Sequence, residues 1–374
     1  MNYYIIPKNN FNIRFNIQLT SNIVKPYISY SLIFYMNDIY NQLFKIQEKE
    51  NEDITIDYVN KIVNTFEFIH SNVPGSTISV SKVKADANIF FELMETFQVF
   101  NINDMLSLKD RINVAHLTNN YTSTNYLLNM LREEHEDNII SEDFNYDKLY
   151  ELFIKNTYKN KLDLIICEFH PDEYNDTKKY INNMILVFLI IIKYQTNQGM
   201  CVIKMDNILY KAVIDVIFII SGIYDKIYLV KPSISNITKG ERYLICKGFN
   251  ENLNNQNKIL ENVEEQLISK MNNSELMSNQ FINSIIDNEL PYYFLNRLEE
   301  SNLVIGQQQL EAYDQIINIF KNNNREEKIE SLKRSHIQKC IQWCEKNQLP
   351  HNKFIDKTNI FLAPKKKQEE IETI

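Results

Sequence analysis

The sequence predicts an α/β protein with a Rossmann-like, doubly wound sheet. Short apolar runs alternate with long helical patterns between residues 162 and 249. The order strand, helix, strand, helix, strand is typical of a parallel sheet. The apolar runs show no polar alternation, which is typical of strands that are buried on both faces. The chain has 374 residues, 44% of them hydrophobic, and can therefore bury a sizeable core.

The predicted strands are short apolar runs, and they cover residues 162–167, 200–204, 226–230 and 242–246. A helix is expected between the first two strands, over 177–197, and Gly199 would end it. A second helix begins after Asp206 and Asn207, which can cap it, and runs to about residue 222. The last two strands lie too close together for a helical crossover, so we expect them to pair antiparallel.

The chain divides into three stretches by composition. Residues 1–50 are rich in Asn and aromatic side chains and are expected to form an N-terminal arm. Residues 51–250 hold the α/β domain, and residues 251–374 are polar and predicted to be helical throughout. The net charge of −8 excludes a basic coat that binds nucleic acid through its overall charge.

The sequence favours a soluble intracellular protein without a membrane partner. The first residues lack a basic region followed by an apolar core, so no signal peptide is expected. The longest apolar run, 184–192, is half of the ~20 residues that a membrane span needs. The five cysteines are an odd number without disulfide-like spacing, which favours a reducing compartment.

Ligands of open α/β sheets bind at the carboxyl ends of the strands. This rule selects Glu168, at the end of the first predicted strand, and Lys204, at the end of the second. It also selects the Pro74-Gly75 turn, because a strand-like run over 66–72 precedes it and a helix led by Ser and Thr is expected after it. Such a turn can bring the backbone close to a small ligand.

Three segments carry ordered motifs: GMCVIK over 199–204, KPSISN over 231–236 and GERYLICKGF over 240–249. They resemble the FtsJ-type ribose 2′-O-methyltransferases, which carry GG-x-[FM]-[VI]-x-K, then KPxxSR, then SE-x-Y-[IL]-V-x-x-G. The resemblance is strongest to the FtsJ-like proteins of nucleocytoplasmic large DNA viruses. A weaker match covers residues 66–82 and 162–170.

The resemblance implies an enzyme that moves a methyl group from S-adenosylmethionine to a ribose 2′-hydroxyl of capped RNA. The family uses a Lys-Asp-Lys-Glu tetrad, in which a lysine amine tuned toward neutrality acts on the hydroxyl. By this match Lys204 is the activating base, Glu241 is the final glutamate, and Glu168 stands in place of the aspartate. Asp38 falls at the position of the first lysine. The cofactor segment, acid-x-PGG in the family, corresponds to Asn72, Pro74, Gly75 and Ser76.

The departures from the family pattern leave a second function open. Asp38 replaces a cation by an anion, Glu168 is one methylene longer than aspartate, and Ser76 replaces a glycine that lets the backbone approach the cofactor. The alternative is a catalytically inactive methyltransferase-fold subunit. Such a subunit would bind RNA or a partner, namely a capping enzyme, an RNA polymerase or a virion component. For either function the expected location is the host cytoplasm or the virion.

Two further groups contain residue types that bind metals. The first is an acidic loop with Glu168, His170, Asp172 and Glu173, for which a solvated loop is the favoured interpretation. The second is the set His336, Cys340 and Cys344, which recurs at every fourth position, with His351 nearby. Zinc ligand pairs are usually separated by a loop. A half-buried helix face beside Trp343 is therefore the favoured interpretation, and no metal site is predicted.

Overall fold

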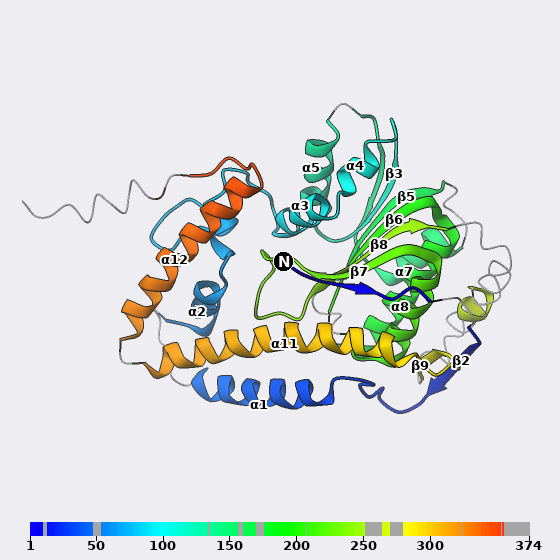
Figure 1. The fold of residues 1–374 in the computed structure, drawn as a ribbon, viewed down its shortest axis with the longest axis horizontal. Helices are drawn as coiled ribbons and strands as arrows, with labels where there is room; N and C mark the ends of the chain where they lie inside the picture. The colour runs from blue at the N-terminus through cyan, green and yellow to red at the C-terminus, as the bar shows by residue number, and fades with distance from the viewer. Residues whose placement is uncertain are drawn as a thin grey trace, which may run out of the picture.

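The chain forms a central seven-stranded sheet with helices on both faces (Figure 1). The computed structural model describes residues 1–9, 13–47, 54–133, 135–155, 160–169, 176–206, 208–250, 264–269, 280–322, 324–352 and 354. The strand order of the sheet is β1-β7-β8-β6-β5-β3-β4, and β2 and β9 form a second, two-stranded sheet.

The strands are β1 (Asn2–Ile6), β2 (Phe15–Thr20), β3 (Asn113–Leu117), β4 (Asn138–Glu142), β5 (Leu162–Glu168), β6 (Gln195–Met205), β7 (Tyr224–Lys231), β8 (Arg242–Phe249) and β9 (Phe281–Ile286). The longer helices are α1 (Tyr30–Gln47), α2 (Ile56–Val63), α3 (Ile89–Val99), α5 (Tyr121–Leu131), α7 (Thr177–Tyr194), α8 (Lys211–Ile223), α11 (Tyr292–Lys321) and α12 (Arg325–Lys346). The short helical turns are η1 (Glu67–Ile69), α4 (Ile102–Leu106), α6 (Tyr146–Leu149) and η2 (Tyr150–Ile154).

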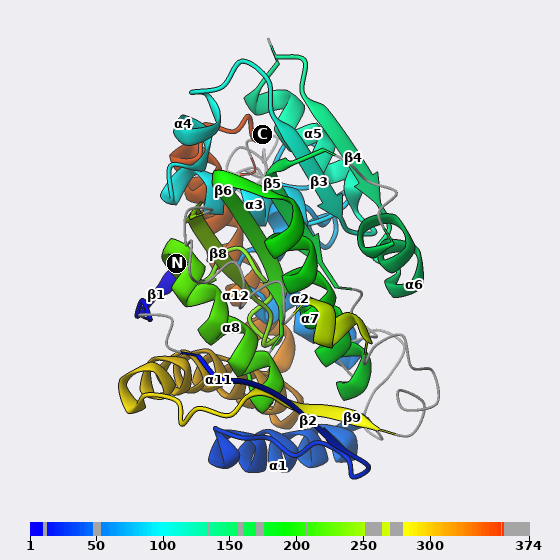
Figure 2. The same cartoon turned by 90° about the vertical axis from the view of Figure 1, so that its right-hand side faces the viewer.

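The central sheet is mostly parallel, which confirms the predicted α/β class. Strands β4, β3, β5 and β6 pair with their neighbours in parallel. Strand β8 runs antiparallel between β6 and β7, as the close spacing of the last two strands predicted. Every residue of β5 is buried, because helices cover both faces of the sheet (Figure 2).

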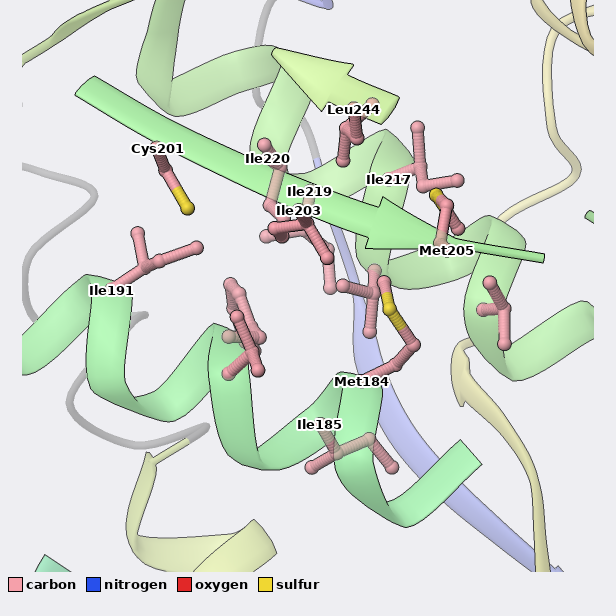
Figure 3. Close-up of a cluster of buried hydrophobic side chains, with 14 of the residues drawn as sticks. Met184, Ile185, Ile191, Cys201, Ile203, Met205, Ile217, Ile219, Ile220 and Leu244 are labelled. Atoms are coloured by element: carbon pink, nitrogen blue, oxygen red, sulfur yellow. The ribbon is translucent and has the colours of Figure 1, made fainter. Parts of the chain in front are cut away.

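Helices α7 and α8 cover one face of the sheet and make an apolar core with it (Figure 3). Met184 and Ile191 of α7 face Ile203 of β6, and Ile217 of α8 packs beside them. These four side chains are at most 1% exposed. Truncating such a side chain, for example Ile203→Ala, costs about 2–5 kcal/mol of stability through the cavity that remains. Among the described helices, none is long and apolar enough to cross a membrane.

Helices α3 and α5 cover the opposite face, and α2 and α12 pack outside them. His336 of α12 forms a hydrogen bond through Nδ1 with the carbonyl of Ile62 at 2.9 Å. Cys340 and Cys344, on the same helix, are also buried. In the part of the chain that the structure describes, no group of three or more His, Cys, Asp or Glu side chains is arranged to hold a metal ion. His170, Asp172 and Glu173 lie outside the described residues.

The segment before the Pro74-Gly75 turn is not the strand that its apolar character predicted. It forms the 3₁₀ turn η1, and its backbone bonds to the chain that follows: Val80 N–H donates to Phe68 O at 2.7 Å, and Ser81 N–H to Ile69 O. The helix expected after the turn begins only at Ile89. As a result β3 lies directly beside β5 in the sheet.

The described parts of residues 1–50 and 251–374 are built into the fold. The N-terminal arm supplies β1 to the edge of the central sheet, and α1 packs along α11. The C-terminal region is not helical throughout, because it contains β9, which pairs with β2. Asp215 of α8 holds β9 in place. Its carboxylate accepts hydrogen bonds from Ser284 Oγ and Ile285 N–H and so connects the strand to the helix. Gly199 lies inside β6 and does not end α7, which stops at Tyr194.

Protonation of His116 should limit the stability of the fold in acid. The ring is fully buried in β3, and its polar neighbour Asn125 offsets only part of the effect of burial. Burial lowers the pKa of His116 to about 4. Between pH ~6.5 and ~4 the unfolded chain therefore binds a proton that the folded chain excludes, and stability falls by roughly 3 kcal/mol as the pH drops. Urea unfolding at several pH values measures this loss of stability. His116→Leu should abolish it, whereas the control His135→Leu should lose as much stability on acidification as the unmodified chain.

Candidate functional site

Three predicted residues converge at the carboxyl edge of the parallel strands. In β5 and β6 Glu168 lies in register with Lys204, and Lys204 lies in register with Tyr243 of β8. Side chains two residues apart point to the same face of a strand. Tyr243 therefore points to the α3 side of the sheet, as Lys204 and Glu168 do. Glu241 directly precedes β8 and reaches the same side, because its carboxylate contacts Lys204.

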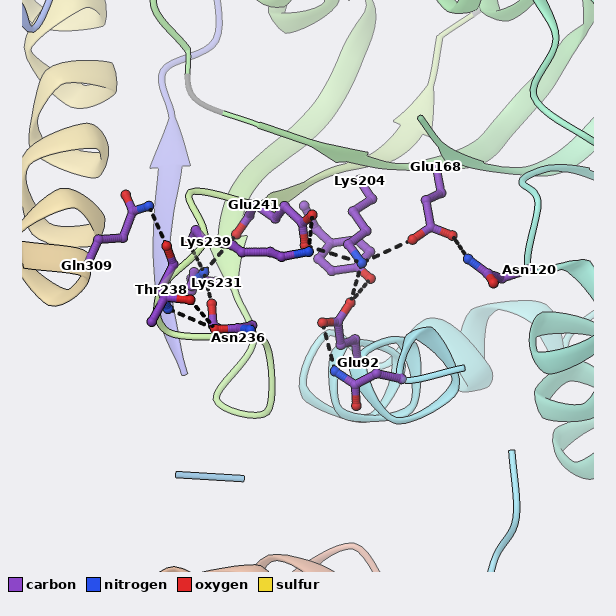
Figure 4. Close-up of polar contacts among 12 residues, drawn as sticks. Glu92, Asn120, Glu168, Lys204, Lys231, Asn236, Thr238, Lys239, Glu241 and Gln309 are labelled. Carbon is purple, nitrogen blue, oxygen red and sulfur yellow. Dashed lines mark hydrogen bonds and ion pairs between the residues drawn. The ribbon is translucent and has the colours of Figure 1, made fainter. Parts of the chain in front are cut away.

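Lys204 lies among three carboxylates (Figure 4). Its Nζ is 3.0 Å from Glu168 Oε1, 3.0 Å from Glu92 Oε2 and 3.6 Å from Glu241 Oε2. The three residues that the resemblance assigned to tetrad positions, Lys204, Glu168 and Glu241, therefore lie together. We call these four side chains the Lys204 cluster.

Glu92 is the member of the cluster that the sequence analysis missed. It lies on α3, whose sequence IFFELMETFQV is otherwise largely apolar, and its side chain is almost fully buried. Tyr243 OH donates a hydrogen bond to Glu92 Oε2 at 2.5 Å. An acidic residue within an apolar helix is the signal that could have identified Glu92, because buried carboxylates are nearly always paired.

Hydrogen bonds hold Glu168 as a carboxylate. Thr118 Oγ1 donates to its Oε2 at 2.7 Å, and Asn120 Nδ2 donates to the same oxygen at 2.9 Å. Burial alone would raise the pKa of Glu168, but Lys204 and these two donors outweigh burial and lower the pKa below its usual value. Glu168 is therefore ionised at neutral pH and can accept a proton or a hydrogen bond.

The carboxylates hold Lys204 as an ammonium ion. Burial would lower its pKa, but the charges of Glu92, Glu168 and Glu241 outweigh burial and raise the pKa well above the usual value. This direction is opposite to the neutral amine that the resemblance implies for an activating base. An ammonium group can donate hydrogen bonds and stabilise a developing oxyanion, whereas it cannot take up a proton.

A second buried lysine orders the loop that carries Glu241. Lys231 Nζ donates to the carbonyls of Asn236 at 2.9 Å, Lys239 at 2.5 Å and Glu241 at 3.2 Å. Burial lowers the pKa of Lys231 to about 8. From the other side, Glu95 of α3 accepts a hydrogen bond from the backbone of this loop. The position of Glu241 therefore depends on Lys231 and on α3.

A pocket of ≈ 470 Å³ lies beside the Pro74-Gly75 turn. Its lining is mostly polar and consists of His70, Asn72, Thr77, Ile78, Ser79, Ser81, Lys82, Val83, Lys84, Ala85 and Asn352. Of the four residues predicted to bind the cofactor, only Asn72 lines it. Gly75 has a φ of +81° with open space around it, and Ser76 Oγ accepts a bond from a backbone N–H within its own turn.

The pocket carries positive charge and adjoins the Lys204 cluster. Lys82 and Lys84 are exposed, and neither forms an ion pair with a described residue. Burial lowers the pKa of His70, and the nearby charges of Glu67 and Glu92 offset part of that effect. His70 thus lines the pocket and interacts electrostatically with Glu92 of the cluster.

Asp38 does not join the cluster. It lies on the exposed side of α1, where Gln42 donates a hydrogen bond to its carboxylate. Helix α1 runs along α11, and Figure 1 shows it on the outside of the molecule. The position that the resemblance gave to a tetrad lysine is therefore outside the site.

The residues beside the turn do not fit S-adenosylmethionine. That cofactor carries two cations, the sulfonium and the ammonium, and one carboxylate, so Lys82 and Lys84 repel its net positive charge and can pair only with the carboxylate. No strand of the sheet precedes the turn, because the segment before it forms η1. The turn therefore lacks the position at a strand's carboxyl end where such folds bind their ligands.

Comparisons with known proteins do not assign this chain to a family. No family model and no curated protein matches this chain. Among solved structures, one match is a Plasmodium falciparum protein described as a putative ribosomal RNA methyltransferase, with a TM-score of 0.32 and 15% sequence identity. The match covers 44% of this chain and 97% of that one.

The Lys204 cluster makes a direct prediction about stability. Lys204→Met should lower the free energy of unfolding by about 3–5 kcal/mol, because it leaves three carboxylates buried without their cation. Adding Glu92→Gln and Glu168→Gln should restore part of that loss. Guanidinium unfolding followed by circular dichroism measures both effects. The control is Lys239→Met, whose amine is half-exposed and 3.7 Å from Glu241, and which should cost less than ~1 kcal/mol. Equal losses in the two single variants would contradict this account of the cluster.

Proposed function

We propose that this chain is a methyltransferase-fold protein that binds the sugar-phosphate backbone of RNA and does not transfer methyl groups by itself. The observation that carries the proposal is the pocket beside the Pro74-Gly75 turn. It presents Lys82 and Lys84, which have no ion-pair partner among the described residues, beside the segment that the resemblance assigns to the cofactor.

The lining of the pocket matches the chemistry of a nucleic-acid backbone. Lysine, serine, threonine and asparagine side chains are the groups that contact phosphate and sugar oxygens. The lining includes Lys82 and Lys84 together with hydroxyl and amide side chains. The chain as a whole has a net charge of −8, so this local positive charge stands apart from its surroundings. Such contacts bind RNA without reading its sequence.

The Lys204 cluster argues against methyl transfer. A ribose that reached Lys204 would meet an ammonium group, which cannot accept the hydroxyl proton, and three carboxylates, which repel the flanking phosphates. The ion pairs instead join α3 to β5, β6 and the start of β8. We therefore assign the cluster a structural role next to the RNA site.

The proposal predicts salt-dependent binding of short single-stranded RNA. Fluorescence anisotropy between 50 and 200 mM salt should show that Lys82→Ala/Lys84→Ala weakens binding at every salt concentration. The slope of log K against log salt should also become shallower by about 1.4, since two phosphate contacts are lost. Capped and uncapped RNA should respond alike, because the lost contacts are to the backbone.

The matched control is Lys8→Ala/Lys226→Ala. It removes the same charge from exposed side chains near the β1–β7 edge. The control should retain the affinity and salt slope of the unmodified chain. If both double variants bind RNA equally, the pocket is not the RNA site.

A second candidate function is the S-adenosylmethionine-dependent ribose 2′-O-methyltransferase that the resemblance implies. The contacts of Lys204 with Glu168 and Glu241 favour it, because these are three of the four tetrad positions. In that function Lys204 would hold the ribose 2′-oxygen and a carboxylate would accept its proton.

Calorimetry and a transfer assay separate the two functions. We expect no heat of binding with S-adenosylmethionine and no transfer of a labelled methyl group to capped RNA by the purified chain. Transfer above background that Glu241→Gln abolishes would establish the enzyme and overturn the inactive assignment. Glu241→Gln is preferred to a change at Lys204, because it removes a charge without leaving the carboxylates unpaired.

A further inference from the structure

Helix α1 has one buried side and one exposed aromatic side. Its buried side packs closely on α11, where Leu32 occupies the space over Gly306: a Cβ added there would lie 2.2 Å from the leucine. On the opposite side Tyr30, Phe34 and Phe44 are 64%, 69% and 73% exposed. Figures 1 and 2 both show α1 at the periphery of the molecule. The aromatic side therefore faces outward from a rigidly held helix.

The exposed side follows the spacing of a coiled-coil seam. Its central positions are Tyr30, Phe34, Asn37, Asn41 and Phe44, which are separated by four, three, four and three residues. When side chains recur every 3.5 residues on average, they form a stripe along one side of a helix that can pack on the matching stripe of a partner helix. None of the five side chains is charged. We call these five residues the α1 seam.

We propose that the α1 seam is the two-fold interface of a homodimer, in which α1 of one copy packs antiparallel on α1 of a second copy. This proposal does not depend on RNA binding or on methyl transfer.

The apolar area of the seam is comparable to the apolar part of a standard interface. Its three aromatic side chains, Tyr30, Phe34 and Phe44, are 64–73% exposed. With side chains of about 200 Å² each, they present roughly 400 Å² of apolar surface. A standard protein–protein interface buries about 800 Å² per partner, of which slightly more than half is apolar.

A second copy of this chain suits the seam because the seam is complementary to itself. Two chains of net charge −8 repel each other, so they can approach most easily through an uncharged surface. In an antiparallel pair centred on residue 39, Phe34 of one copy faces Phe44 of the other, and Asn37 faces Asn41. Aromatic rings then meet aromatic rings, and amides meet amides. Buried Asn pairs of this kind select one register at some cost in stability.

Sedimentation velocity tests the dimer. At micromolar concentrations the unmodified chain should sediment at twice its 44.5 kDa mass. Phe34→Glu should sediment as a monomer with an unchanged melting temperature, because the side chain is largely exposed. The matched control is Leu108→Glu, which makes the same charge change at an 85% exposed site on the turn after α4 and should remain a dimer. A monomeric unmodified chain, or a dimer that Phe34→Glu leaves intact, would overturn the proposal.

Disulfide trapping tests the register. All five native cysteines are buried, so new thiols on the seam can be observed separately. Under oxidised glutathione, Asn37→Cys and Asn41→Cys should crosslink rapidly when the two variants are mixed and slowly when each is alone. Faster crosslinking in either single variant would exclude the antiparallel register.

Discussion

The Lys204 ammonium group and its three carboxylates are the interaction on which the rest of the site depends. Four elements meet there: Glu168 ends β5, Lys204 lies near the end of β6, Glu241 precedes β8, and Glu92 comes from α3. Charges this deeply buried are stable only when they are paired. The pairing therefore fixes α3 against the sheet, and α3 in turn holds the 232–241 loop through Glu95. A displacement of any one element would leave an uncompensated charge.

The buried Arg242 joins the N-terminal arm and α11 to the sheet. Arg242, at the start of β8, donates to Ser301 Oγ and Asn302 Oδ1 of α11, and Asn302 donates to Ser29 Oγ and to the carbonyl of Ile208. The N-terminal arm, α11 and the central sheet thus share one hydrogen-bond network. This network explains why the arm is part of the fold, and it sets α1 rigidly on α11 with its aromatic side outward.

Lys204 and the two pocket lysines, Lys82 and Lys84, differ in the acidic side chains that surround them. Around Lys204 the negative charges exceed the positive charge, so the amine is held protonated. In the neighbouring pocket Lys82 and Lys84 have no acidic partner among the described residues, so their charges remain available to an anion. The same fold thus holds Lys204 inside a set of ion pairs and leaves Lys82 and Lys84 at a pocket without such a set among the described residues.

The strands from β5 to β8 and the antiparallel pairing of the last two could be predicted from the sequence, because local apolar runs and short connections act over small separations along the chain. The grouping of Lys204, Glu168 and Glu241 was an expectation from the family resemblance, and the structure brings these side chains together. Contacts between distant segments set the other features. Residues 66–72 have the apolar character of a strand, yet their backbone bonds to residues 80 and 81 and their side chains pack against α12, which lies far away in sequence. Glu92 became part of the site because α3 packs over β6, and Asp38 was excluded because α1 packs on α11. Secondary-structure propensity and motif spacing indicate which elements a segment can form. Which other elements it packs against depends on contacts between residues that are distant in the chain.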